Sequence, residues 1–249
     1  MRHGSYAFKT DIGKVRTHND DKAQVAMNAN GEVFLVVCDG MGGAKKGDLA
    51  SQIAIETLVD AFRHKRKHHF VATNRSWFTK VAKKANSLIY EYAENNPDAK
   101  GMGTTLVCAL ISDNTLYTCC IGDSRCYMLI KRNKLKQLTE DQTYVNFLVS
   151  TGKISEEEAL SHPDRHVLMN ALGIFPSLSL AFNEFEYQGE TILCCSDGLY
   201  NQVPLDEMAN ILSTDERCDQ KADSLIAIAN SNGGSDNIAV ALWECISND

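Results

Sequence analysis

The sequence lacks long apolar runs, an excess of basic charge and CxxC cysteine pairs, and each absence excludes a class of protein. No apolar run approaches the ~18 residues of a membrane-spanning helix. The first residues carry Arg2, Lys9 and Asp11 and have no apolar core of the kind a secretory signal needs. We therefore expect a protein that is neither exported nor anchored, located in the cytoplasm.

Charge and cysteine usage point the same way. The formal net charge is −7, which argues against a nucleic-acid partner, because phosphate binding draws its affinity from clustered Lys and Arg. The 9 cysteines form no CxxC pair and mostly lie inside apolar runs, as free thiols of a reducing compartment do. A soluble cytoplasmic protein that handles cations fits both observations.

The apolar pattern predicts more strands than helices. A chain of 249 residues with 44% hydrophobic residues can bury a large core, and no linker or repeat divides it, so we expect one domain, 1–249. β-branched apolar runs predict strands. Gly122-Asp123-Ser124 predicts a hairpin turn between the runs 116–121 and 125–130. The predicted strands are Val33–Cys38, Thr104–Ile111, Thr191–Cys195, Ile238–Trp243, Leu116–Ile121 and Arg125–Ile130.

Two long helices are predicted next to each other, over 48–64 and 76–94, with Asn96-Pro97 ending the second. Because they do not alternate with strands, the order differs from a doubly wound parallel sheet and favours an α+β fold, an antiparallel sheet covered by helices. Residues 139–173 contain few β-branched runs, a Gly152 break and an acidic SEEEA segment. We expect a small helical excursion there.

Aspartates stand at the predicted ends of several strands. Asp39 follows the apolar run 33–38 and precedes glycine, and Asp197 follows the strand at 191–195 and also precedes glycine. A lone Asp-Gly commonly marks a hairpin turn, but neither of these two is followed by a turn short enough for a hairpin. Further aspartates at such positions are Asp20, Asp21, Asp123 and Asp236.

Several carboxylates at one end of a sheet would repel one another unless cations held them. Oxygen ligands suit the hard ions Mg²⁺ and Mn²⁺. A glycine directly after a ligand aspartate lets the backbone turn so that its carbonyl also faces the metal. We therefore interpret Asp39 as a shared metal ligand, with Gly40 contributing a carbonyl.

Six motifs in order give the chain a family resemblance. It resembles the metal-dependent protein Ser/Thr phosphatases of type 2C, the PPM family, in its bacterial form, from about Lys9 to Trp243. The motifs are TDIGKVRTHNDD (10–21), VCDGMGG (37–43), GTTLVCAL (103–110), IGDSRCY (121–127), CSDGLY (195–200) and GGSDNIAV (233–240). The resemblance implies an αββα sandwich of two antiparallel β-sheets flanked by helices, with a small helical flap at about 139–175.

The resemblance also implies roles for individual residues. Asp39 matches the carboxylate that bridges two central metal ions, Mn²⁺ or Mg²⁺, with the Gly40 carbonyl and Asp21 on one ion. Asp197 and Asp236 match ligands of the other ion. Asp123 resembles the ligand of a third, weaker site found in bacterial members.

Arg16 matches the arginine that binds the substrate phosphate, and its planar guanidinium could hold two phosphate oxygens. The plainer alternative is a surface salt bridge to Asp20 or Asp21. Two ions roughly 3.5–4 Å apart can hold and activate a bridging hydroxide that attacks phosphorus directly, so no nucleophilic Ser or Cys is needed. The sequence thus predicts hydrolysis of phosphoserine and phosphothreonine.

Some residues depart from the family pattern. Met41 stands where eukaryotic members often have a histidine proposed as the general acid. Gln142-Thr143 and Met169-Asn170 differ from the family's His-Ser and Thr-Arg in the flap, which affects substrate preference more than catalysis. Two other functions remain open: a catalytically silent phosphoprotein-binding module and a hydrolase of small phosphoesters. The expected partners are phosphorylated proteins and an opposing Ser/Thr kinase, and we expect a monomer.

Overall fold

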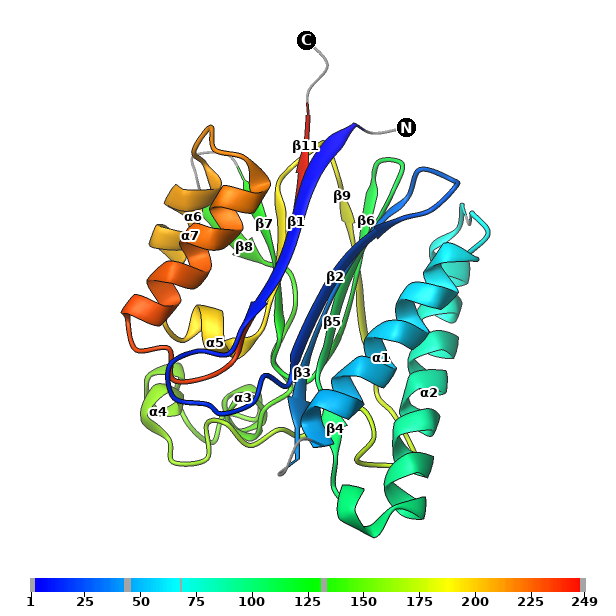
Figure 1. The fold of residues 1–249 in the computed structure, drawn as a ribbon, viewed down its shortest axis with the longest axis vertical. Helices are drawn as coiled ribbons and strands as arrows, with labels where there is room; N and C mark the ends of the chain where they lie inside the picture. The colour runs from blue at the N-terminus through cyan, green and yellow to red at the C-terminus, as the bar shows by residue number, and fades with distance from the viewer. Residues whose placement is uncertain (1–2, 43–45, 68, 131–133, 247–249) are drawn as a thin grey trace.

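Two antiparallel β-sheets lie face to face, and helices cover the outer face of each (Figure 1). The computed structural model describes residues 3–42, 46–67, 69–130 and 134–246. Gly43, the last residue of the VCDGMGG motif, lies outside these ranges. The arrangement confirms the predicted α+β class and the αββα sandwich.

The first sheet joins the two ends of the described chain, because β1 pairs with β11 over its whole length. Helices α6 (Leu205–Leu212) and α7 (Cys218–Ser231) pack on its outer face. Its strands in spatial order are β1 (Gly4–Asp11), β11 (Ile238–Cys245), β10 (Ile192–Cys195), β7 (Arg125–Ile130) and β8 (Lys134–Gln137).

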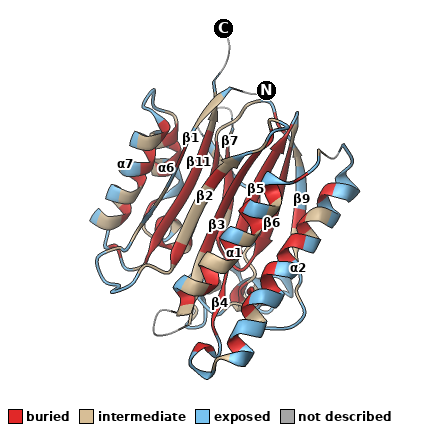
Figure 2. Cartoon of the chain, turned by 45° about the vertical axis from the view of Figure 1, so that its right-hand side comes forward, coloured by how far each residue is buried: buried red, intermediate tan, exposed pale blue. Residues whose placement is uncertain are grey.

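The second sheet is covered by α1 (Lys46–Arg63) and α2 (Val71–Asn95), on the right of Figure 1. The apolar side chains of both helices face the sheet, and their outward sides are exposed, as the red and blue faces in Figure 2 show. Its strands in spatial order are β2 (Asp21–Met27), β3 (Val33–Met41), β5 (Leu106–Ser112), β6 (Thr115–Ile121) and β9 (Ala181–Glu186), and β4 (Gly103–Thr104) pairs with β3.

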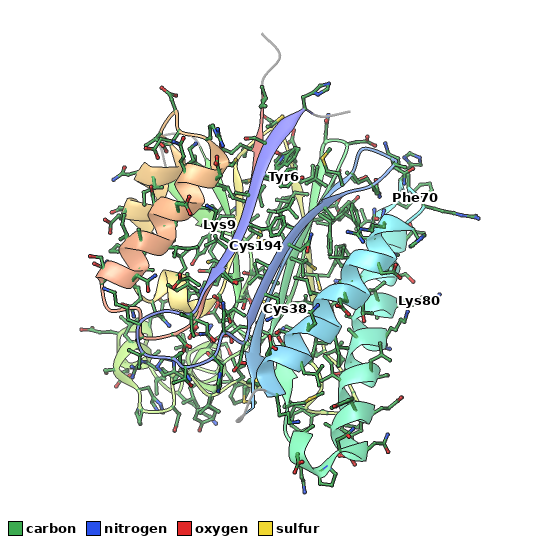
Figure 3. All side chains as sticks on the ribbon, viewed as in Figure 1. Tyr6, Lys9, Cys38, Phe70, Lys80 and Cys194 are labelled. Atoms are coloured by element: carbon green, nitrogen blue, oxygen red, sulfur yellow. The ribbon has the colours of Figure 1, made fainter. Side chains whose placement is uncertain are left out.

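Side chains from both inner faces fill the space between the sheets. Leu35 and Val37 of β3 meet Cys194 of β10 and Trp243 of β11 in one buried cluster. All nine cysteines are free thiols and eight are buried, Cys38 and Cys194 among them, in opposite sheets (Figure 3). This confirms the interpretation of the cysteines as small buried apolar residues.

The predicted hairpin at Gly122-Asp123-Ser124 is wrong. Strand β6 pairs with β5 and β9, whereas β7 pairs with β10 and β8, so the turn carries the chain from one sheet to the other. A glycine-containing turn between two apolar runs looks the same in sequence whether the strands pair or separate. The pairing was decided by β5 and β9, which occupy both edges of β6.

The predicted helices are present with shifted ends. The second begins at Val71, five residues before the predicted Ser76, because its first turn carries polar residues that hide the apolar period. The segment 139–173 contains α3 (Tyr144–Ser150) and α4 (Glu156–Ser161), as predicted, and Figure 1 places both below the first sheet. The short helices η1 (Pro97–Ala99) and α5 (Asp197–Tyr200) complete the described elements. Within the described ranges, no helix is both long and apolar enough to cross a membrane.

Candidate active site

The predicted site residues gather at one end of the sandwich, the lower end in Figure 1. A pocket of about 600 Å³ lies there between the ends of both sheets and the flap. Asp21 is not among the pocket-lining residues but lies buried behind them, with 1% of its surface exposed. The predicted residues that line the pocket are Arg16, Asp39, Gly40, Asp123, Asp197 and Asp236.

The backbone of Asp39 is fixed by two threonines. The Asp39 N–H donates to Thr105 Oγ1 at 3.0 Å, and its carbonyl accepts from the Thr105 N–H at 2.8 Å and from Thr104 Oγ1 at 2.9 Å. With its backbone satisfied by these partners, its carboxylate is left to line the pocket. Thr105 Oγ1 also lies 2.7 Å from Ser124 Oγ, which ties Asp39 to the turn that carries Asp123.

Gly40 allows a close approach of three chain segments. A Cβ there would lie 2.2 Å from the carbonyl oxygen of Gly47 and 2.6 Å from that of Asp20. The Gly40 N–H donates to the same Asp20 carbonyl at 3.2 Å. Any larger residue would push the start of α1 and the segment before β2 away from the end of β3.

Asp21 and Asp39 are directly opposite each other in the antiparallel pairing of β2 and β3. Opposed side chains lie on the same face with Cβ atoms about 4.5–5.5 Å apart, so like charges there destabilise the sheet. Asp21 accepts a 2.6 Å hydrogen bond from the hydroxyl of Ser196. This pair therefore brings together a carboxylate from the second sheet and a residue that follows β10 of the first.

Asp197 and Asp236 flank strands of the first sheet, and Asp236 lies two residues before β11. Asp197 follows β10, and Gly198 after it allows contact with the start of β11, since a Cβ there would lie 1.9 Å from the carbonyl oxygen of Asn237. The Asn237 side chain holds the segment before β2: it donates to the carbonyls of Ile12 and His18 and accepts from the Asp20 N–H.

Arg16 reaches Asp236 from the segment that Asn237 holds. Its Nη2 donates to Asp236 Oδ2 at 2.7 Å, so the alternative prediction of an ion pair with Asp20 or Asp21 is wrong. The Arg16 side chain remains 55% exposed. A guanidinium anchored at one end and open to the pocket has donors left for an anionic ligand.

Asp123 lies where the chain crosses between the sheets and is 8% exposed. Beside it, Arg125 makes a two-pronged ion pair with Asp141, the first residue of the Asp141-Gln142-Thr143 segment, with a shortest distance of 2.7 Å. The Arg125 guanidinium also lies 3.6 Å from the ring centroid of Tyr200. These contacts fix the base of the flap to β7.

Two departures from the family pattern contact each other in the flap. Asn170 Nδ2 donates to Gln142 Oε1 at 2.7 Å. The Gln142 N–H donates to the Gly122 carbonyl at 2.8 Å, and Gln142 Oε1 accepts from the Gly122 N–H at 3.2 Å. Gln142 and Asn170 thus connect the flap to the turn that carries Asp123.

Burial and mutual repulsion raise the pKa of four carboxyl groups at the site, those of Asp21, Asp39, Asp123 and Asp197. Burial is the main cause for each, and neighbouring aspartates add to it. The pKa of Asp21 rises to about 8, opposed by the Ser196 hydrogen bond, and that of Asp123 to about 7. The pKa of Asp197 rises to about 6, where Arg16 opposes the shift, and that of Asp39 lies well above its usual range. Without a cation, the ionised aspartates repel one another, and this repulsion destabilises the folded state.

The donor set fits hard divalent cations. It consists of carboxylate oxygens, and the pKa values of Asp21 and Asp39 are raised. Among the described residues that line the pocket, Arg16 is the one Lys or Arg side chain. Across the ranges that the structure describes, no three His, Cys, Asp or Glu side chains are arranged as ready-made ligands of one ion. Small hard cations retain several waters and take one or two carboxylates each, so pairs such as Asp21–Asp39 meet their requirement.

The sequence reasoning missed several residues that build the site. Ser196 and Asn237 stand next to Asp197 and Asp236, inside motifs that were recognised, but hydrogen bonds between distant segments leave no periodic signal. His18 and His166 also line the pocket, from the segment before β2 and from the flap. His18 lies inside the motif at 10–21 and His166 follows His162 by four residues, but neither pattern by itself indicates a place in the pocket.

Comparisons with known proteins give matches over nearly the whole chain. Residues 13–242 match the family described as protein phosphatase 2C. The chain is 41% identical over 238 residues to the serine/threonine phosphatase Stp of Listeria welshimeri, covering 95% of this chain and 94% of that one. Its fold is similar to that of a solved S. agalactiae serine/threonine phosphatase, with a TM-score of 0.91, 30% identity and coverage of 98% and 100% of the two chains.

A second solved structure is the catalytic domain of the serine/threonine protein phosphatase PstP in complex with 2 manganese ions. It has a TM-score of 0.84 and 32% identity, and the match covers 98% of this chain and 99% of that chain. Similarity therefore extends over nearly the whole chain in both sequence and fold.

Proposed function

The chain belongs to the protein phosphatase 2C family and is a phosphatase, and from this premise we propose that it removes phosphate from phosphoserine and phosphothreonine residues of proteins. The observation that carries the proposal is the cluster of carboxylates at the pocket, where half-buried Asp39 meets buried Asp21 and further aspartates next to strands of both sheets. The Stp and PstP relatives, whose names describe serine/threonine phosphatases, support it. We take residues 1–249 as one catalytic domain.

We propose Mn²⁺ or Mg²⁺ as the cofactor, as two central ions and a weaker third. Asp39 would bridge the two central ions, with Asp21 and the Gly40 carbonyl on one side and Asp197 and Asp236 on the other. Asp123 would hold the third ion. When bound, the ions supply water activation and stabilise charge on the attacking and leaving oxygens.

The chain's own residues bind and orient the substrate. Arg16 lies at the edge of the carboxylate cluster, and its free guanidinium donors would hold two oxygens of the phosphate. Asn237 and Gly40 fix the segment that carries Arg16, so the phosphate would be held at a constant position relative to Asp39. Such positioning supplies much of the acceleration of phosphate ester hydrolysis.

We further propose that the enzyme acts as a cytoplasmic monomer on phosphoproteins and opposes a Ser/Thr kinase. Nine free thiols suit a reducing compartment. The pocket has a volume of about 600 Å³, which leaves room for a protein side chain together with its phosphate.

Phosphate release from a phosphothreonine peptide tests the proposal. We expect turnover with added Mn²⁺, loss of turnover with EDTA, and loss of turnover in the Asp39→Asn variant. Folded wild-type protein that binds the peptide without turnover would instead be a phosphoprotein-binding module. Faster hydrolysis of small phosphoesters than of any phosphopeptide would point to a metabolite phosphatase.

A further inference from the structure

The pocket extends beyond the space that a phosphate group needs. Its volume of about 600 Å³ equals that of roughly twenty water molecules at about 30 Å³ each, whereas a phosphate has five heavy atoms. One flank carries the aspartates and Arg16. On the flap side, four residues form an apolar flank beside the polar His166 and Asn170: Leu168, Ala171, Ile174 and Phe175.

The apolar flank faces solvent through two large side chains. Phe175 is 54% exposed and Ile174 is half-buried, although both line the pocket. Burying this surface under another apolar side chain would remove it from water, which is favourable by roughly 25 cal/mol per Å².

The apolar flank is held from outside the pocket by Asn86 of α2. Asn86 Oδ1 accepts from the Gly173 N–H at 2.8 Å, and Asn86 Nδ2 donates to the Phe175 carbonyl at 2.9 Å. Asn86 is 2% exposed, so these bonds are shielded from water. The two bonds involve the residues directly before and after Ile174, so they fix the backbone of the flank against α2.

The flank is also connected to Asp39. Leu172 and Thr104 exchange backbone hydrogen bonds of 2.9 and 3.1 Å, and Thr104 Oγ1 donates to the Asp39 carbonyl at 2.9 Å. Ile174 follows Leu172 by two residues. The distance between the apolar flank and the carboxylate cluster is therefore set by rigid backbone contacts, as a site that reads a fixed spacing in its ligand requires.

We propose that Ile174 and Phe175 form a subsite for a bulky apolar side chain next to the phosphorylated residue of a protein substrate. The inference rests on the proposed phosphatase function and specifies its substrate class: phosphopeptide segments with Leu, Ile, Met or Phe beside the phosphothreonine. Asn86 acts as a positioning residue, because it touches the subsite backbone and not the substrate.

Paired phosphothreonine peptides test the subsite. The two peptides of a pair differ only in one residue adjacent to the phosphothreonine, leucine or serine, and pairs are made for each side. We expect wild-type enzyme with Mn²⁺ to favour the leucine peptide of one pair by roughly tenfold in kcat/KM, mostly through KM. In the Phe175→Ala variant the ratio should fall toward one.

Phe147→Ala is the matched control. Phe147 is another phenylalanine of the flap, 44% exposed, but it does not line the pocket. This variant should keep the wild-type ratio between leucine and serine peptides. Because Phe175 is more than half exposed, its truncation leaves no cavity, and unchanged thermal unfolding will show that the variant is folded.

The outcomes separate the subsite from the proposed function. A wild-type enzyme that hydrolyses both peptides of every pair equally is a phosphatase without this subsite, which overturns the inference alone. No hydrolysis of any peptide overturns the proposed function. Asn86→Ala should lower the peptide ratio as Phe175→Ala does, whereas a lower Tm with an unchanged ratio would reduce Asn86 to a structural role.

Discussion

The hydroxyl of Ser196 donates a hydrogen bond of 2.6 Å to Asp21 and accepts one of 2.8 Å from the Ala239 N–H. Asp21 begins β2 of the second sheet, and Ala239 belongs to β11 of the first. Ser196 is fully buried. One side chain therefore joins the two sheets at the carboxylate cluster, and it orients the most deeply buried carboxylate of the site.

Replacing Ser196 by alanine should weaken both the fold and cation binding. The variant leaves a buried carboxylate without this donor, which costs about 1–3 kcal/mol. The pKa of Asp21 should rise further, since the Ser196 hydrogen bond lowers it. Urea unfolding and Mn²⁺ titration at pH 7.5 measure the two effects, with the exposed Ser150→Ala as control. Unchanged Mn²⁺ affinity would remove Asp21 from the proposed ligand set.

Stability without cations should fall as the pH rises. The folded-state pKa values of Asp21, Asp123 and Asp197 are raised from 3.8 to about 8, 7 and 6. Between about pH 4 and 8 the folded state therefore binds more protons than the unfolded state, and raising the pH favours unfolding.

In EDTA, we expect the free energy of unfolding to drop by several kcal/mol from pH 5 to pH 8, since one pKa unit corresponds to about 1.4 kcal/mol and the pKa values of three carboxyl groups are raised. Added Mn²⁺ should reverse the loss at pH 8. Stability that rises over this interval in EDTA would show that the carboxylates do not repel one another in the folded protein.

The Asp39→Asn variant should be inactive and yet more stable than wild type at pH 8 in EDTA. Asparagine has nearly the same shape but no charge, so it removes repulsion with Asp21, Asp197, Asp123 and Asp236. We expect a gain of about 1 kcal/mol or more, together with loss of Mn²⁺-induced stabilisation. Thermal unfolding with and without Mn²⁺ measures both, and a destabilised variant would contradict the repulsion argument.

Arg16→Ala should raise the KM for phosphopeptides by roughly 10- to 100-fold, because hydrogen bonds to charged groups contribute about 1.5–3 kcal/mol. Stability should change by less than about 1 kcal/mol, since the ion pair with Asp236 is solvent-exposed. Arg16→Lys should recover only part of the loss because lysine lacks the planar fork. Full activity of the alanine variant would exclude Arg16 from phosphate binding.

A buried ion pair far from the pocket gives a purely structural prediction. Lys65 Nζ lies 2.9 Å from Glu32 Oε1, and the two side chains are 0% and 1% exposed. Lys65→Met leaves a buried charge unpaired and should cost about 3–5 kcal/mol. The double variant with Glu32→Gln should recover much of this. Lys67→Met, which breaks the exposed pair with Asp113, should cost less than 1 kcal/mol and serves as control.

The sequence predicted the elements of the fold better than their pairing. The apolar runs of β3, β10 and β11 identified buried strands, and the aspartates at their ends identified the pocket. The crossing between sheets at Asp123 was missed, because local turn chemistry does not record which strand becomes the neighbour. The contacts of Ser196, Asn237 and Asn86 join segments 43–225 residues apart, and only the folded chain reveals them.

The position of β11 between β1 and β10 has a consequence for synthesis. This strand is the last of the described chain to leave the ribosome, and until it arrives β1 has no partner strand in the first sheet. The carboxylate of Asp236 arrives with it. Until residues through Cys245 have emerged, β1 is unpaired and β10 is paired on one side only, so we expect phosphatase activity to begin only after this strand has emerged.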